Sequence, residues 1–122
     1  MIRALNVRHR FRRARERITL SFPDFTLASG EQVAVTGPSG SGKTTLLHLL
    51  AGLLVASEGE VWVHGQNLSR LGEAERDRYR ARRVGYVFQD FHLIEGYTAT
   101  ENVVVGLGLA GVGGPHRLER AR

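Results

Sequence analysis

The sequence predicts an α/β fold, in which short apolar strands alternate with helices. Residues 32–36 form a short apolar run that leads directly into a glycine-rich loop, and a leucine-rich helical pattern follows at 43–54. A second apolar run, at 84–88, comes directly after a charged helical segment at 73–83. Apolar strands and helices in this arrangement favour the α/β class.

Length and composition narrow the class of protein. At 122 residues the chain holds one domain at most. Cysteine is absent, which excludes disulfides and thiolate metal sites and favours a reducing compartment. No apolar run approaches the roughly 18 residues that span a bilayer, and the N-terminus lacks a signal-peptide pattern, so we expect a cytoplasmic location. The net charge of +5 permits contact with nucleic acid or anionic membrane.

The N-terminal part has the features of an antiparallel sheet. Weak alternation predicts a first strand at 3–11, and the basic stretch 8–17 is interpreted as a hairpin turn. Further strands are expected at 18–22, at 25–27 and, after Gly59, at 60–64.

The loop after the apolar run carries the strongest functional signal. Residues 37–44 match G-x-x-x-x-G-K-[ST], the phosphate-binding P-loop, with a strand expected before it and a helix after it. Its Lys43 is the chain's one lysine, against 16 arginines. Lysine is a compact point charge on a flexible stem, whereas arginine presents a broad planar fork. The residue type and the spacing therefore both indicate a nucleoside triphosphate site.

Each part of the loop has a predicted role. The glycines let backbone N–H groups converge on an anion, and the N-terminus of the following helix adds positive charge. Lys43 is expected to reach the β- and γ-phosphates, the Thr44 hydroxyl to bind Mg²⁺, and Thr45 to reach the α-phosphate. The predicted ATP-binding residues of the loop are Gly37, Pro38, Ser39, Gly40, Ser41, Gly42, Lys43, Thr44 and Thr45.

Four segments together resemble the ATP-binding domain of an ABC transporter. Phe11 stands where that family has an aromatic residue, and residues 37–45 have the form of P-loop that the family prefers. Residues 50–61 are similar to the family's turn after the P-loop helix, and 84–94 are similar to its Q-loop. The continuation at 98–103 is similar to the subgroup that exports lipoproteins, macrolides or peptides.

The resemblance implies a truncated P-loop NTPase fold of ABC type. Its parts would be an N-terminal antiparallel β subdomain, the P-loop strand and helix of a parallel core sheet, and the Q-loop region. The resemblance also implies further site residues and ligands. It implies that Phe11 stacks on adenine, and that Gln89 contacts Mg²⁺ or the attacking water and moves with its loop. The implied catalytic residues are Lys43 and Gln89, the implied Mg²⁺ contacts are Thr44 and Gln89, and the cofactors are ATP and Mg²⁺. The apolar cluster of Leu93, Ile94 and Tyr97 has two interpretations: an anchor for its loop, or part of the groove for the membrane subunit.

The sequence also lacks family motifs. It has no Leu-Ser-Gly-Gly-Gln signature, no apolar strand ending in Asp-Glu, and no histidine placed as the family's switch residue. We therefore expect 1–122 to be a single partial domain, truncated after the Q-loop region, and by itself inactive or nearly so in ATP hydrolysis. The resemblance implies two partners, a transmembrane transporter subunit and a second ATP-binding domain in a head-to-tail dimer. It places the chain at the inner face of the cell membrane, held there through the partner subunit.

Alternative functions remain for this sequence. A GTPase needs Asn-Lys-x-Asp for guanine, which is impossible because Lys43 is the only lysine. A small P-loop kinase would need an arginine-rich lid, for which residues 76–83 are a candidate. A non-catalytic nucleotide- or nucleic-acid-binding protein would use the basic stretch 8–17, although a solvated hairpin is the preferred interpretation and nucleic acid is not the expected partner.

The C-terminal part is predicted to be helical. Residues 98–101 match a capping box, with a helix expected through about Ala110. Residues 111–115 are expected to break that helix, and another begins at His116. The sequence does not reveal the transported substrate.

Overall fold

The computed structural model describes residues 1–13, 16–90, 92–114 and 116–121, without the side chains of residues 12, 13, 16 and 17. The chain divides into two compact units, Met1–Arg76 and Asp77–Arg122, and each is described by itself. The first unit contains the sheet and the P-loop, and the second contains the Q-loop region.

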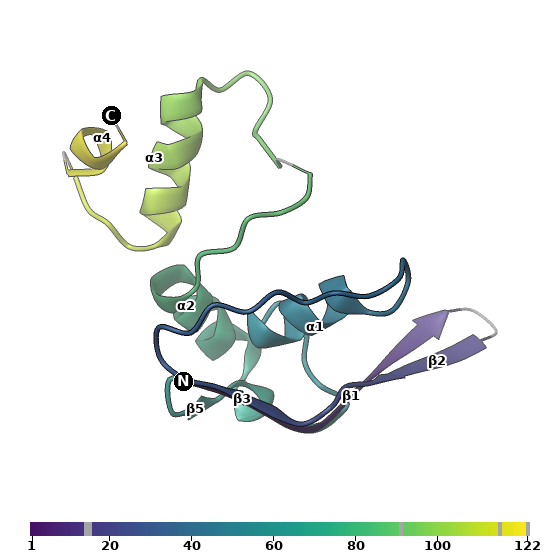
Figure 1. Cartoon of the computed structure of the whole chain (residues 1–122). Coiled ribbons are helices and arrows are strands. Elements are labelled where there is room, and N and C mark those ends of the chain that lie inside the picture. The colour runs from purple at the N-terminus through teal and green to yellow at the C-terminus, as the bar shows by residue number, and fades with distance from the viewer. Residues whose placement is uncertain (14–15, 91, 115, 122) are drawn as a thin grey trace. The chain divides into compact units, whose positions relative to one another are not determined.

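The first unit is built on an antiparallel sheet with the strand order β2-β1-β4-β5, and β3 also pairs with β1 (Figure 1). The strands predicted for this antiparallel sheet are confirmed, with longer bounds for the first two. The basic stretch is part of β1 and β2, so the turn predicted over 8–17 is wrong for most of its length; its centre, 14–15, lies outside the described residues. The strands are β1 Ile2–Arg13, β2 Glu16–Ser21, β3 Phe25–Leu27, β4 Glu58–Val63 and β5 Gln66–Asn67.

The pairing of β1 with β4 contains an irregularity that depends on one glycine. The register shifts between Leu5 and Arg8, and Asn6 adopts a positive φ of 50°. Opposite this bulge, Gly59 has a φ of +83°, and a Cβ there would meet the Asn6 carbonyl oxygen. The backbones approach so closely that only glycine fits.

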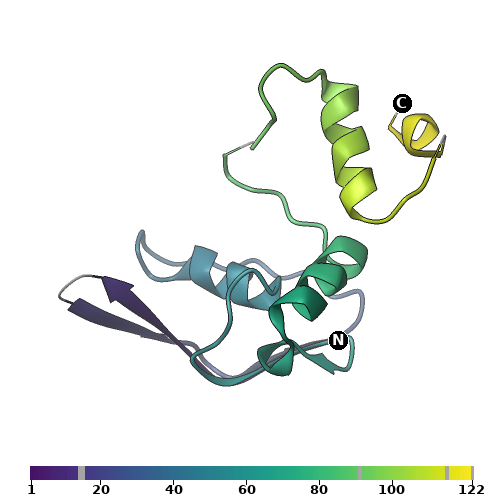
Figure 2. The same ribbon diagram turned by 180° about the vertical axis from the view of Figure 1, so that it is seen from behind.

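Helix α1, Lys43–Leu50, lies over one face of the sheet and contacts β4 (Figure 2). It ends four residues before the predicted Leu54. Leu46 and Leu49 are buried, but Leu47 is 42% exposed, so the prediction of a helix buried on most sides is wrong. The helix is one-sided because only the sheet face packs against it.

The two apolar runs expected as core strands are not strands in the described part of the chain. Residues 32–36 and 84–88 have no ladder partner there, and Val33 is 54% and Val87 96% exposed. Parallel strands exist only beside other strands, and no described segment supplies such a neighbour. The predicted parallel sheet is therefore not formed within these residues.

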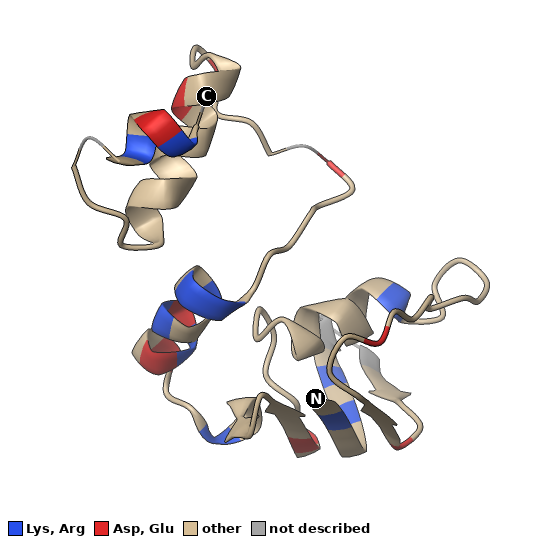
Figure 3. Ribbon diagram, turned by 60° about the vertical axis from the view of Figure 1, so that its left-hand side comes forward, with Lys and Arg blue, Asp and Glu red and all other residues tan. Residues whose placement is uncertain are grey.

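The remaining elements are helical. The short 3-10 helix η1 spans Leu68–Arg70, and α2 spans Glu73–Arg83 as predicted. Acidic residues lie toward the start of α2 and arginines toward its end, coloured red and blue in Figure 3. In the second unit, α3 spans Ala99–Leu109 and begins at the predicted capping box, and α4 spans His116–Arg120. Pro115 of the predicted break lies outside the described residues.

Candidate nucleotide-binding site

The P-loop takes backbone conformations that require its glycines. Gly40 and Gly42 have φ values of +79° and +92°, which side-chain-bearing residues rarely adopt. At Gly37 a Cβ would lie 2.9 Å from the Ser41 hydroxyl oxygen, and the Ser41 N–H donates to the Pro38 carbonyl oxygen at 3.3 Å. Positive φ values thus favour glycine at positions 40 and 42, and a close contact within the loop favours it at position 37.

Gly42 joins the loop to α1 and to the sheet. It is the N-cap residue of α1 and makes no side-chain cap hydrogen bond, so the first N–H groups of the helix are available to an anion. A Cβ on Gly42 would lie 2.9 Å from Leu20 Cδ1 and 3.4 Å from the Phe22 ring. Two side chains from the end of β2 therefore pack directly against the base of the P-loop.

Lys43 extends along the loop instead of into solvent. Its Nζ donates to the carbonyl oxygens of Gly37 at 2.9 Å and Pro38 at 2.7 Å. An ammonium group has three donors, so these two bonds leave one for a further acceptor. The ammonium is thus held at the loop's first residues, a position suited to a phosphate chain bound in the loop.

The other loop residues are accessible. Ser39, Gly40 and Thr44 are exposed, and Thr45 is half-buried. Their roles toward phosphate and Mg²⁺ stay predictions, but the accessible hydroxyls and the tight glycine cradle fit a phosphate chain with its cation. Within the described part of the chain, no three His, Asp or Glu side chains gather as a metal site of their own.

Phe11 lies in β1 on the side of the sheet that the P-loop touches. It pairs across the hairpin with Ile18, and His9 pairs with Leu20, the residue that packs on Gly42. Directly opposite residues of an antiparallel pair share a face, and alternate residues of a strand do too. The half-buried Phe11 ring therefore belongs to the same face as the loop contact, which agrees with its predicted role.

Gln89 belongs to the second unit and is exposed in a bend. Beside it, the Phe88 ring contacts Tyr86 at 4.5 Å and His92 at 4.6 Å between ring centroids. Its role at Mg²⁺ stays a prediction. Phe91, within the predicted Q-loop, lies outside the described residues.

The structure adds residues that sequence reasoning missed. Leu20 and Phe22 were expected only as strand residues, and His9 was given no role, yet these side chains contact Gly42 and Phe11. No sequence signal marks them, because their importance depends on the register between β1 and β2.

A glycine cradle, a lysine held at its rim and a helix N-terminus at its base define a P-loop nucleotide-binding domain. The sequence pattern of the ABC transporter family matches residues 20–122, and the chain belongs to this family. The family expectation drawn from the sequence is thereby confirmed.

Individual relatives agree with this assignment. The lipoprotein-releasing system ATP-binding protein LolD of Psychrobacter arcticus is 49% identical over 84 residues, which are 69% of this chain and 37% of that protein. LolD of Pseudomonas syringae pv. tomato is 46% identical over 104 residues, 85% of this chain and 46% of that protein. These similarities confirm the predicted likeness to the subgroup of lipoprotein, macrolide and peptide exporters.

The fold also matches solved structures of ATP-binding cassettes. The cassette MJ0796, in a dimeric post-hydrolysis state bound to ADP and Pi, superposes with a TM-score of 0.91 at 35% identity. The match covers 99% of this chain and 54% of that one, so the chain spans about half the length of the proteins it resembles. Among the described residues no helix is long and apolar enough to cross a membrane.

Proposed function

We propose that the chain binds MgATP through residues 37–45, as the ATP-binding, energy-coupling part of an exporter-type ABC transporter. The observation that carries the proposal is the position of Lys43, whose Nζ is held by the carbonyl oxygens of Gly37 and Pro38 beside a tight glycine cradle. An anion in this cradle meets backbone N–H groups, a helix N-terminus and a cation together.

Further residues and partners belong to the same proposal. Phe11 would stack on adenine, Thr44 and Gln89 would contact Mg²⁺, and Thr45 would contact the α-phosphate. The metal would supply neutralisation of the phosphate charge. A transmembrane subunit and a second ATP-binding domain in a head-to-tail dimer would be the partners, and the chain would lie at the inner face of the membrane through the former.

Hydrolysis requires more than these residues provide. The signature, the Asp-Glu strand and the switch histidine of the family are absent from the sequence. Phosphoryl transfer depends on positioned charges and on activation of the attacking water. We therefore propose that this chain binds nucleotide and is by itself nearly inactive in hydrolysis.

The test is binding of ATP and of inorganic tripolyphosphate, each with Mg²⁺, measured by calorimetry. Lys43→Ala should abolish both, and Lys43→Arg should weaken both more than tenfold, because the planar fork does not reproduce the point charge at the loop carbonyls. Arg78→Ala is the matched control: Arg78 is an exposed arginine of α2, and its loss changes the net charge equally.

The outcomes distinguish a general electrostatic attraction from binding in the proposed P-loop site. If Arg78→Ala weakens tripolyphosphate binding as much as Lys43→Ala does, a general electrostatic attraction replaces the proposed site. If neither variant changes binding, the loop is not a phosphate site. DNA binding that depends steeply on salt and is unaffected by Lys43→Ala would instead favour the nucleic-acid alternative.

A further inference from the structure

The hairpin of β1 and β2 carries an aromatic contact that the proposed function does not use. The rings of His9 and Phe11 lie 4.6 Å apart between centroids and are inclined by 77°, an edge-to-face arrangement. Such pairs are favourable beyond the area they bury, and they restrict the orientation of both rings. The ring proposed to stack on adenine is thus supported by a neighbour on its own strand.

His9 is itself fixed from a distant part of the chain. Its Nδ1 lies 2.9 Å from the Val55 carbonyl oxygen. Because a carbonyl oxygen only accepts, Nδ1 is the donor in this bond, which sets the orientation of the imidazole. His9 therefore links Phe11 to the segment that leads from α1 into β4.

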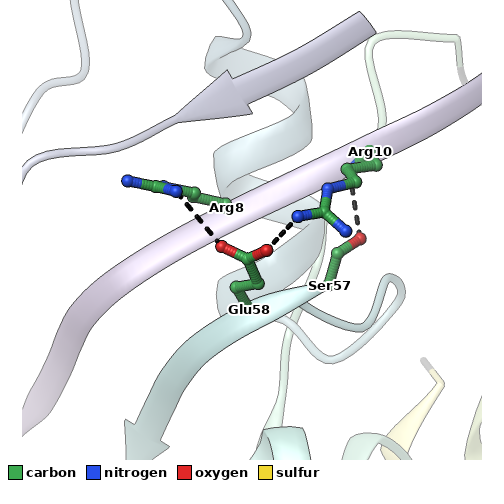
Figure 4. Close-up of polar contacts among 4 residues, drawn as sticks. All are labelled: Arg8, Arg10, Ser57 and Glu58. Carbon is green, nitrogen blue, oxygen red and sulfur yellow. Dashed lines mark hydrogen bonds and ion pairs between the residues drawn. The ribbon is translucent and has the colours of Figure 1, made fainter. Parts of the chain in front are cut away.

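Two hydrogen bonds of Ser57 hold the two segments in this register. The Arg10 N–H donates to the Ser57 hydroxyl at 3.0 Å, and the Ser57 N–H donates to the Arg8 carbonyl oxygen at 2.8 Å. Glu58 forms ion pairs with both Arg8 and Arg10, as Figure 4 shows. Successive residues of a strand face opposite sides, so the side chains of Arg8 and Arg10 lie on the side of β1 away from His9 and Phe11.

The position of His9 along the strand gives it a role in nucleotide binding. It pairs with Leu20, which packs on Gly42 of the P-loop, whereas Phe11 is one side-chain step further along the same face. On that face, His9 thus lies between the P-loop and Phe11, the ring proposed to stack on adenine. Its hydrogen bond to Val55 connects this part of β1 to the segment that follows α1.

We infer that His9 is a positioning residue for adenine recognition: held by Val55, it braces the Phe11 ring at the spacing from the P-loop that a nucleotide needs. The inference rests on the proposed function, because it assumes that the P-loop binds the phosphates and Phe11 the base. It assigns His9 an effect on ATP and none on ligands that lack a base.

The experiment compares ATP with tripolyphosphate in the 122-residue chain, with folding of each variant checked by circular dichroism. His9→Ala should weaken ATP binding roughly three- to tenfold, the range expected for one edge-to-face pair, and leave tripolyphosphate binding unchanged. His9→Phe keeps a ring beside Phe11 and should bind ATP within about twofold of the parent. Glu58→Gln, on the opposite side of the strand, is the control and should change neither ligand.

A double-mutant cycle gives the decisive result. In a Phe11→Ala background, His9→Ala should have no further effect on ATP, because the ring that it braces is gone. An equal loss in both backgrounds, equal losses for ATP and tripolyphosphate, or a His9→Phe variant as weak as His9→Ala would each overturn the inference. If the parent chain shows no Lys43-dependent binding of tripolyphosphate, the proposed function itself is refuted.

Discussion

Replacement of Gly59 by alanine tests how the sheet beneath the site is built. The residue has a φ of +83°, and a Cβ there would come closer than 3.0 Å to the backbone oxygens of Leu5 and Asn6. Alanine at such a φ costs about 1 kcal/mol, and displacing a packed backbone adds roughly 1–3 kcal/mol. We expect Gly59→Ala to lower the free energy of unfolding by about 3 kcal/mol in total.

Gly65 offers a matched control in the same sheet. Its φ is +80°, almost equal to that of Gly59, but a Cβ there has no atom within 4 Å. Gly65→Ala therefore keeps the conformational cost and removes the clash, and should cost only about 1 kcal/mol. The difference between the two variants measures the close approach of β1 and β4 at the bulge.

The assay is urea unfolding followed by circular dichroism, with trimethylamine oxide present for all proteins so that destabilised variants remain folded at the start. The expected order of midpoints is parent, Gly65→Ala, then Gly59→Ala. Equal midpoints for the two alanine variants would refute the bulge as the reason for the glycine. An unfolded Gly59→Ala beside a folded Gly65→Ala would support it.

Four further predictions concern the other elements and the chain as a whole. Thr98→Ala should lower the stability of α3 by about 1 kcal/mol in circular dichroism, because the threonine accepts from Glu101 N and completes the capping box. The hydrogen bond from the Thr98 N–H lowers the pKa of Glu101 below its usual 4.5. The stabilisation by the Glu101 carboxylate is therefore full above pH 4.5 and is lost as the pH falls through the lowered pKa. Glu101→Gln should reduce this loss of stability in acid, and an unchanged dependence on pH would contradict the prediction. Glu58→Gln should lower the free energy of unfolding by less than about 1 kcal/mol in urea titrations, because the side chains of Arg8 and Glu58 are 56% and 39% exposed. A larger loss would show that this cluster is more than a surface ion pair. The chain alone should melt below about 50 °C, because the apolar segments 32–36 and 84–88 lack strand partners among the described residues. A cooperative transition well above that temperature would refute this.

The phosphate side of the candidate site could be predicted from sequence because its contacts are local. Lys43 bonds to carbonyl oxygens five and six residues earlier, and a Cβ at Gly37 would meet Ser41 within the same loop. A motif of eight residues contains nearly all of this geometry. The capping box at 98–101 was predictable for the same reason.

The adenine side could not be predicted in this way, because it depends on contacts between distant segments. His9 and Val55 are 46 residues apart, and Arg10 and Ser57 are 47 apart. Their meeting is set by the β1–β4 register, which the bulge at Asn6 shifts. A one-residue change of register reverses which side chains face the loop, and alternation along one strand does not reveal it.

The predicted core strands failed for a related reason. Residues 32–36 have the composition of a buried strand. A parallel strand forms only beside neighbouring strands, and the composition of one segment does not reveal whether those neighbours are present. Without them in the described part of the chain, Val33 and Val35 remain exposed. Pattern reasoning identified the segment correctly as apolar and extended, and could not test for its partners.

Phosphate binding depends on contacts within the P-loop, whereas adenine binding depends on contacts between distant segments. The two should therefore differ in how strongly they respond to a change in the sheet. A change in the sheet that disturbs the β1–β4 register should weaken adenine binding before it reaches Lys43, whose partners lie within the loop. Folded Gly59→Ala, kept so by trimethylamine oxide, should therefore lose affinity for ATP while its affinity for tripolyphosphate stays close to that of Gly65→Ala. Titration of both ligands into both variants measures this ratio. A parallel decline of the two affinities would mean that the P-loop itself depends on the bulge, and that Leu20 and Phe22, which pack on Gly42, transmit the disturbance.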